Sequence, residues 1–338
     1  MEPSDGRSAA RDKKHLAIFL LLTFGLSWTI WLLSGVLTRN GGAVRDSAWL
    51  IAQVGVFAPS VVGLVMMGLR YTEIRRKNGV ILAIFPAVIL VGYMVQRHRP
   101  ASVAEFDTAA ATSLVLLAAI ALIAVHRRGV LCRLGRDDES AKRVNAVWVT
   151  TSLFLLPLFF LISWWAVNAA GGTFRIVSLR GGIGSSLVFL LLAFAQNLLL
   201  GGSMGEEFGW RGFVLPLLLK RQNPVAASIV LGWVWALWHL PIDLSGALLA
   251  PIAAVFFRLI WTIPLTVIFT WIFLRTGGRM MGVLLLHTSV NMLPDLGFNH
   301  YERSMMVMTV LLIVAAVVVA FRPDMRRLIP SPSSCEDP

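Results

Sequence analysis

Long apolar runs separated by short charged segments form the main pattern along the chain. Ten runs carry almost no charge, and they lie at residues 15–37, 47–69, 79–96, 108–126, 146–168, 183–219, 224–242, 251–274, 280–294 and 304–321. An apolar helix of about 20 residues spans the ~30 Å hydrocarbon core of a bilayer. The pattern therefore predicts an all-α, polytopic membrane bundle with about ten transmembrane helices.

The composition supports this class of protein. Of the 338 residues, 57% are apolar and 14% are charged, whereas soluble domains carry about 25% charged residues. These values exclude a soluble globular enzyme, a disordered tail protein and a fibrous protein.

Lys and Arg are distributed unevenly between the segments that connect the apolar runs. When the N-terminus is placed in the cytoplasm, the cytoplasmic segments hold 22 Lys and Arg residues and the opposite segments hold 7, with Arg258 inside a run. Cytoplasmic loops carry such an excess, so we expect both termini to be cytoplasmic. The same placement explains the 30 Lys and Arg against 18 Asp and Glu without a nucleic-acid partner. Cys132 and Cys335 form no Cys-x-x-Cys pair and fall in cytoplasmic segments, so we expect no disulfide and no thiolate zinc site.

The sixth run is too long for one straight helix in a bilayer. Its 37 positions, 183–219, correspond to ~55 Å of helix at 1.5 Å per residue. We therefore predict a bend at the glycine-rich stretch 201–205, because glycine is a common kink residue. Glu206 and Glu207 follow directly, and two carboxylates inside an apolar helix should face protein or water rather than lipid.

Three helices are expected to bring polar side chains to one depth. Measured along the helices from the turn at 220–224, Glu206 lies ~21 Å away and His239 ~22 Å away. On the ninth helix, His287 lies ~14 Å and Asn291 ~20 Å from the same membrane side. The pattern predicts a shared layer of an acid, two imidazoles and an amide.

The spacing of these residues suggests roles but leaves alternatives open. Glu207 and Arg211 are separated by four positions and can pair on one helix face, which leaves Glu206 for chemistry. In the alternative, both glutamates pair with Arg211 and the three side chains form a polar plug. His287 and Asn291 also share a helix face. They could form an oxyanion or metal site, or they could form hydrogen bonds that hold two helices together.

Charged residues near the ends of the runs have simpler expected roles. We expect Arg258 to extend its guanidinium toward the outer surface. We expect Asp243 and Asp295 to be solvated in outer loops.

The stretch 205–212 resembles the EExxxR motif of the CPBP family, which contains CAAX proteases, bacteriocin-processing proteins and type II CAAX prenyl endopeptidases. Glu206, Glu207 and Arg211 occupy the motif positions. The resemblance covers roughly 183–294, about a third of the chain.

Two further motifs of this family follow in the right order. Trp235 and His239 match its FxxxH motif, with Trp in place of Phe, and His287 and Asn291 match its HxxxN/D motif. The aromatic exchange falls at an expected packing position and casts little doubt on activity.

The resemblance implies a catalytic mechanism. Glu206, helped by His239, would activate a water as general base, and His287 and Asn291 would stabilise the oxyanion. Glu207 and Arg211 would hold the motif in place. The resemblance leaves open whether a metal takes part. Glu206, His239 and His287 would supply a three-ligand zinc site, and catalysis without a metal fits the same residues. The helical zinc signature HExxH is absent.

We therefore expect an intramembrane endopeptidase whose site opens toward the cytoplasmic side. Its substrate would be a membrane-associated protein or peptide, such as a lipidated CAAX-like segment or a leader peptide. A non-catalytic peptide-binding or immunity protein is the main alternative, and a proton-relaying transporter is a weaker one. The arginine- and alanine-rich composition resembles that of bacterial proteins, so we expect a multi-pass protein of the bacterial cytoplasmic membrane.

The same interpretation divides the chain into five parts. We expect a cytoplasmic tail, an N-terminal membrane region of five helices, a catalytic membrane core, a last transmembrane helix and a second cytoplasmic tail. They are residues 1–14, 15–182, 183–294, 295–321 and 322–338.

Overall fold

The structure, a computed structural model, describes residues 3–39, 43–70, 72–97, 108–128, 138–171, 174, 182–246 and 251–328. These residues form an all-helical bundle. Its helices are α1 (Pro3–Arg39), α2 (Ala43–Arg70), α3 (Thr72–Arg97), α4 (Thr108–Arg128), α5 (Asp138–Ala169), α6 (Gly182–Leu199), α7 (Ser203–Gly209), α8 (Leu215–Leu219), α9 (Pro224–Trp238), α10 (Leu240–Gly246), α11 (Pro251–Arg275), α12 (Met280–Asn291), α13 (Tyr301–Ala320) and α14 (Pro323–Arg326). Cys132 and Cys335 lie outside the described residues.

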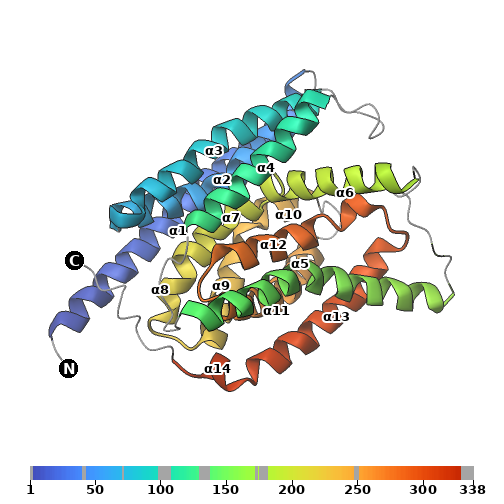
Figure 1. Cartoon of the computed structure of the whole chain (residues 1–338). Helices are drawn as coiled ribbons and strands as arrows, with labels where there is room; N and C mark the ends of the chain where they lie inside the picture. Colours follow the sequence, from blue (N-terminus) through green and yellow to red (C-terminus); the bar gives the residue numbers. More distant parts are fainter. Residues whose placement is uncertain are drawn as a thin grey trace.

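Helices account for most of every predicted apolar run, and they form a layered arrangement. Figure 1 shows α1 to α4 along one side of the bundle and α5, α11 and α13 along the other, with α7, α9 and α12 between them. α1 begins at Pro3, so most of the expected tail at 1–14 is helical, and the division of the chain into five parts stays a prediction.

Six helical segments within the described residues are long and apolar enough to cross a membrane. They are Ala9–Leu37, Ile51–Arg70, Ala146–Ala169, Gly184–Leu219, Ala253–Arg275 and Tyr301–Ala320. The helical stretches Ala111–His126, Pro224–Trp238 and Met280–Asn291 are apolar but shorter. The class of multi-pass helical membrane protein is therefore confirmed, while the count of ten spans and their orientation stay predictions.

The sixth apolar run breaks where the glycines are. α6 ends at Leu199, α7 begins at Ser203, and Gly202 between them has φ 104°, a conformation that side chains with a Cβ rarely adopt. A second irregularity, the π-helical turn Trp210–Val214, joins α7 to α8. In this turn the Leu215 N–H bonds to the Trp210 carbonyl, five residues back, and the next residue, Pro216, has no N–H to donate.

Two glycines let α7 approach α2 closely. A Cβ at Gly205 would lie 2.8 Å from the Val56 carbonyl oxygen, and one at Gly209 would collide with the Pro59 carbonyl. This is a Gly-x-x-x-Gly contact of the kind that brings membrane helices together. The N-terminal helices therefore pack directly on the helix that carries the two glutamates.

α1 also packs on the central helices. The Trp28 indole N–H donates to the Trp238 carbonyl at 3.0 Å, and the Trp31 and Trp238 rings lie 4.7 Å apart. Phe19 packs edge-on against Trp210, with 5.5 Å between ring centroids. The region outside the family resemblance thus supports the site rather than standing apart from it.

Basic helix ends gather at one end of the bundle. Asp12, which is 5% exposed, pairs with Arg70 at 2.8 Å and with Lys220 at 3.1 Å. Arg275 at the end of α11 pairs with Asp324 of α14 at 2.8 Å. We call this the basic end, defined by Arg70, Lys220 and Arg275. It corresponds to the side that the charge distribution predicts to be cytoplasmic.

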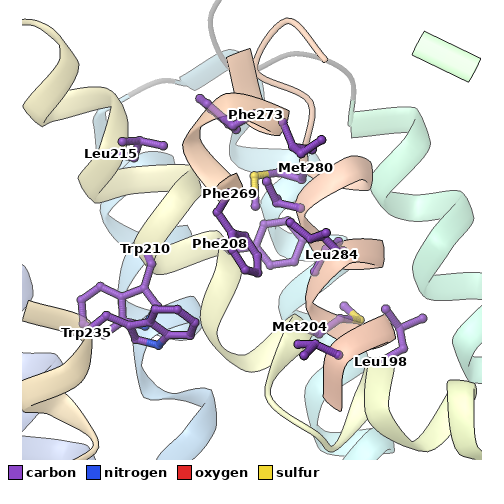
Figure 2. Packing of buried hydrophobic residues seen from close by; sticks show 14 of the residues in the cluster. Leu198, Met204, Phe208, Trp210, Leu215, Trp235, Phe269, Phe273, Met280 and Leu284 are labelled. Atoms are coloured by element: carbon purple, nitrogen blue, oxygen red, sulfur yellow. The ribbon is translucent and has the colours of Figure 1, made fainter. Parts of the chain in front are cut away.

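One apolar cluster fills the space between the central helices. Figure 2 shows Phe208 of α7, Phe269 of α11, and Met280 and Leu284 of α12 in this cluster. All four are at most 2% exposed, so the helices that carry the polar residues are held in a dry and tightly packed core.

Candidate active site

Glu207, Arg211 and His287 form a buried charged cluster between α7, the π-helical turn and α12. The Glu207 Oε1 atom accepts from Arg211 Nη1 at 2.9 Å and from His287 Nδ1 at 2.7 Å. Glu207 and Arg211 are both 0% exposed. The predicted pairing of Glu207 with Arg211 is present, and the same carboxylate also orients the imidazole.

Arg211 lies between two aromatic rings. Its Cζ atom is 4.2 Å from the Trp235 ring centroid and 4.1 Å from the Phe269 ring centroid. Both contacts have cation–π geometry, which helps to offset the cost of burying a guanidinium. The rings come from α9 and α11, so the arginine ties the motif helix to both.

Glu206 makes its hydrogen bond to a residue outside the charged cluster. Its Oε2 atom accepts from the Trp235 indole N–H at 2.6 Å, and the residue is 4% exposed. A Cβ at Gly202 would lie 2.5 Å from its Oε1 atom. The glycine thus leaves room for the carboxylate, and the indole fixes its direction.

His239 ends α9 with a defined ring orientation. Its Nδ1 atom lies 2.8 Å from the Trp235 carbonyl oxygen. Since a carbonyl only accepts, Nδ1 carries the proton in this contact, and Nε2 is the ring nitrogen left for another partner.

Asn291 binds the chain at the break between α6 and α7. Its Nδ2 atom donates to the Gly201 carbonyl. A side-chain amide has two N–H donors, so one remains after this contact. The broken helix therefore supplies the acceptor that orients the amide.

These residues share one cavity. A cavity of about 660 Å³ is lined by Glu206, His239, His287, Asn291 and Trp235, among others. Its remaining lining comes largely from the first half of α11 and the first turns of α13. The volume falls within the usual range for ligand sites, ~300–1,000 Å³.

The structure therefore brings together the four residues that the sequence placed at one depth. It also gives Trp235 a role that the sequence analysis missed, because an aromatic residue at a packing position carries no signal for a hydrogen bond. Arg258 and Asp243 differ from expectation as well. They form a two-point ion pair at 2.5 and 2.8 Å that lines the cavity.

The described side chains do not form a metal site. No group of three His, Cys, Asp or Glu residues within the described ranges is placed to hold a metal ion, and this includes Glu206, His239 and His287. Glu206 instead directs Oε2 at an indole N–H. The residues in this arrangement do not fit a three-ligand zinc ion.

The fold and the site define a multi-pass helical membrane protein with a polar cavity enclosed by apolar helices. Residues 184–293 match the family model described as type II CAAX prenyl endopeptidase Rce1-like. The chain is also 26% identical over 192 residues to CAAX prenyl protease 2 of Methanococcus maripaludis, covering 54% of this chain and 69% of that protein.

The similarity of residues 184–293 to the Rce1-like type II CAAX prenyl endopeptidase family confirms the resemblance expected from the motifs. This similarity indicates a protease. The matched range nearly coincides with the expected core at 183–294.

Proposed function

We propose that the protein is an intramembrane endopeptidase that hydrolyses a peptide bond of a membrane-associated substrate. The observation that carries the proposal is the shared cavity: Glu206, His239, His287 and Asn291 come from three separate helices and line the same space. Each also has a partner that fixes its direction, as preorganised catalytic groups require.

Glu206 and His239 are suited to activate water. The Glu206 carboxylate lines the cavity with one oxygen held by the Trp235 N–H, so its other oxygen is the one available to accept a proton from a water. His239 presents Nε2 as its remaining ring nitrogen, which can share that proton. Together they form the general base of the proposed reaction.

Asn291 and His287 are suited to bind the oxygen that becomes negatively charged. The Asn291 amide is anchored through one N–H on the Gly201 carbonyl and retains the other. His287 is anchored through Nδ1 on Glu207, so it can donate to the oxyanion from Nε2 only as the doubly protonated imidazolium. Anchored donors stabilise a tetrahedral oxyanion without reorganisation.

The substrate would be the peptide segment of a membrane-associated protein, including a lipidated CAAX-like C-terminus or a leader peptide. The cavity combines aromatic and methionine side chains, such as Trp261 and Met305, with the few polar groups of the site. Ligand pockets are typically mostly apolar with a few orienting polar groups.

A cleavage assay with paired variants tests the proposal. Purified protein in lipid is incubated with a peptide library that includes lipidated members, and products are read by mass spectrometry. Glu206→Gln should abolish cleavage, and Asn291→Ala should lower turnover by ~10²-fold. Asp324→Asn makes the same carboxylate-to-amide change at the basic end and should retain turnover. Retained turnover in Glu206→Gln would refute the general-base role.

A further inference from the structure

A second buried asparagine lies close to the break between α6 and α7. Asn197 stands in the last turn of α6 and is 7% exposed, and the lining of the cavity begins four positions later, at Gly201. Its Nδ2 atom donates to the Asp295 Oδ2 atom at 2.6 Å and to the Ala193 carbonyl of its own helix at 2.9 Å. The contact with Asp295 joins α6 to the segment that follows α12.

The contacts of Asn197 and Asn291 form a reciprocal pair. Asn197 of α6 bonds to Asp295, four positions after Asn291. Asn291 of α12 bonds to Gly201, four positions after Asn197. Two hydrogen bonds in opposite directions therefore hold the end of α6 against the end of α12. The one to Asp295 has a carboxylate acceptor, and hydrogen bonds to charged acceptors are shorter and stronger than neutral ones.

Asn197 also lies directly against the backbone that holds Asn291. A Cβ at Gly201 would lie 2.6 Å from the Asn197 Oδ1 atom and 2.8 Å from its Cα. Gly201 follows the last turn of α6, where backbone carbonyls lack a helical partner, and its carbonyl accepts from Asn291. The next carbonyl, that of Gly202, accepts from the Glu206 N–H at 2.8 Å and so begins the helix of the general base. The position of Asn197 therefore bears on the geometry between Asn291 and Glu206.

We propose that Asn197, through its bond to Asp295, is a positioning residue for the oxyanion donor Asn291. This inference rests on the proposed function, which assigns the donor role to Asn291. Without the bond, the segment after α12 and the Asn291 side chain would no longer be fixed relative to the break between α6 and α7. A displacement of ~1 Å in a catalytic group can lower turnover by ~10²-fold.

An asparagine of α5 provides a matched control. Asn168 is 2% exposed and donates to the Trp164 carbonyl of its own helix at 2.7 Å, as Asn197 does to Ala193. It also accepts from the Asn299 side chain at 3.1 Å, and so it anchors the far end of the same segment. Asn168→Ala should therefore cost stability without moving the oxyanion donor.

Steady-state kinetics of the purified protein in lipid test the inference, with a peptide that the wild-type protein cleaves. Asn197→Ala should lower kcat by about 10- to 100-fold. It should leave KM near the wild-type value, because the oxyanion forms only after the substrate has bound. Asn168→Ala should retain the wild-type kcat. Equal losses of kcat in the two variants would overturn the inference, because loosening the segment at either end would then have the same effect.

A double variant shows whether Asn197 acts through Asn291. In an Asn291→Ala background the donor is already absent, so adding Asn197→Ala should lower kcat by less than about twofold. Losses that multiply as independent effects would overturn the inference.

Two variants of the acceptor break or keep the same bond from the other side. Asp295→Asn keeps an acceptor oxygen and should retain turnover, whereas Asp295→Ala should reproduce the loss seen with Asn197→Ala. Because Asp295 is exposed, its replacement also serves if Asn197→Ala fails to accumulate. Wild-type turnover in Asp295→Ala would overturn the inference.

An NMR measurement separates a failure of this inference from a failure of the proposed function. In protein carrying asparagine labelled with heavy nitrogen, the side-chain amide signal of Asn291 is the one missing from Asn291→Ala. Asn197→Ala should shift this signal and Asn168→Ala should leave it in place, whether or not a peptide is cleaved. An unshifted signal in Asn197→Ala would overturn the inference.

The two proposals therefore fail in different ways. A shifted amide signal without cleavage by the wild-type protein would remove the proposed function and keep the positioning of Asn291 by Asn197. Cleavage that Asn197→Ala leaves unchanged would keep the function and remove the inference.

Discussion

Replacing Glu207 with Gln should destabilise the protein strongly, because it leaves a buried guanidinium without its anion. Glu207 and Arg211 are fully buried and their charged atoms lie 2.9 Å apart. At an effective dielectric constant of ~20, this separation corresponds to ~6 kcal/mol of Coulomb attraction. The cost of removing both charges from water offsets part of this attraction. Removing one partner of a buried pair typically costs ~3–5 kcal/mol. We expect Glu207→Gln to lose about this much unfolding free energy.

The double variant separates the charge effect from packing. Arg211→Met combined with Glu207→Gln removes both charges of the pair, so it should lose less stability than Glu207→Gln alone. In both variants the amide oxygen that replaces the carboxylate can still accept from His287 Nδ1. Asp324→Asn is the control, since this carboxylate is 42% exposed and its ion pair should contribute only ~0–1 kcal/mol.

Equilibrium unfolding in mixed micelles with an increasing fraction of SDS would measure these differences. A loss below ~1 kcal/mol for Glu207→Gln, the size of a surface pair, would refute the buried-pair argument. A double variant less stable than Glu207→Gln would refute it as well, because the unpaired charge would then not be the cause.

Three further predictions follow from the packing and the site. Gly209→Ala should cost ~1–3 kcal/mol by overpacking against Pro59, whereas Gly212→Ala, whose Cβ would meet only ordinary contacts from 3.6 Å, should be tolerated; equal losses in SDS unfolding would argue against the close helix contact. Trp235→Phe should lose ~1.5–3 kcal/mol of unfolding free energy in the same assay, because the Glu206 carboxylate loses its donor. An unchanged unfolding curve would show that this hydrogen bond does not stabilise the protein. Dialysis against EDTA should leave turnover unchanged, since the described side chains form no three-ligand group; a loss restored by added Zn²⁺ would contradict the arrangement.

Much of the fold could be predicted because hydrophobicity and glycine placement act locally. The break predicted at 201–205 lies at Gly202, where a positive φ is required. The contact of Glu207 with Arg211 followed from helical spacing alone. The shared depth of Glu206 and His239 followed from the helical rise per residue and the lengths of two helices joined by a short turn.

Other features depended on contacts between distant segments. The π-helical turn Trp210–Val214 arises next to Pro216, and the sequence analysis read only one continuous helix there. The pairing of Arg258 with Asp243 depends on how α10 and α11 pack, and each charge alone resembles an ordinary surface residue.

The role of Trp235 was not predictable for a related reason. An indole on an apolar helix packs well in either orientation, and only the position of α7 brings Glu206 to its N–H.

Hydrolysis of a peptide bond in heavy-oxygen water tests the central claim most directly. Purified protein in lipid is incubated with the lipidated and unlipidated peptide library, and mass spectrometry records both the cleavage site and the oxygen added to the new C-terminus. We expect wild-type protein to yield products with one heavy oxygen and Glu206→Gln to yield none. Equal product from both proteins, or binding of peptides by wild-type protein without cleavage, would contradict the assignment of Glu206 as the base of an intramembrane endopeptidase.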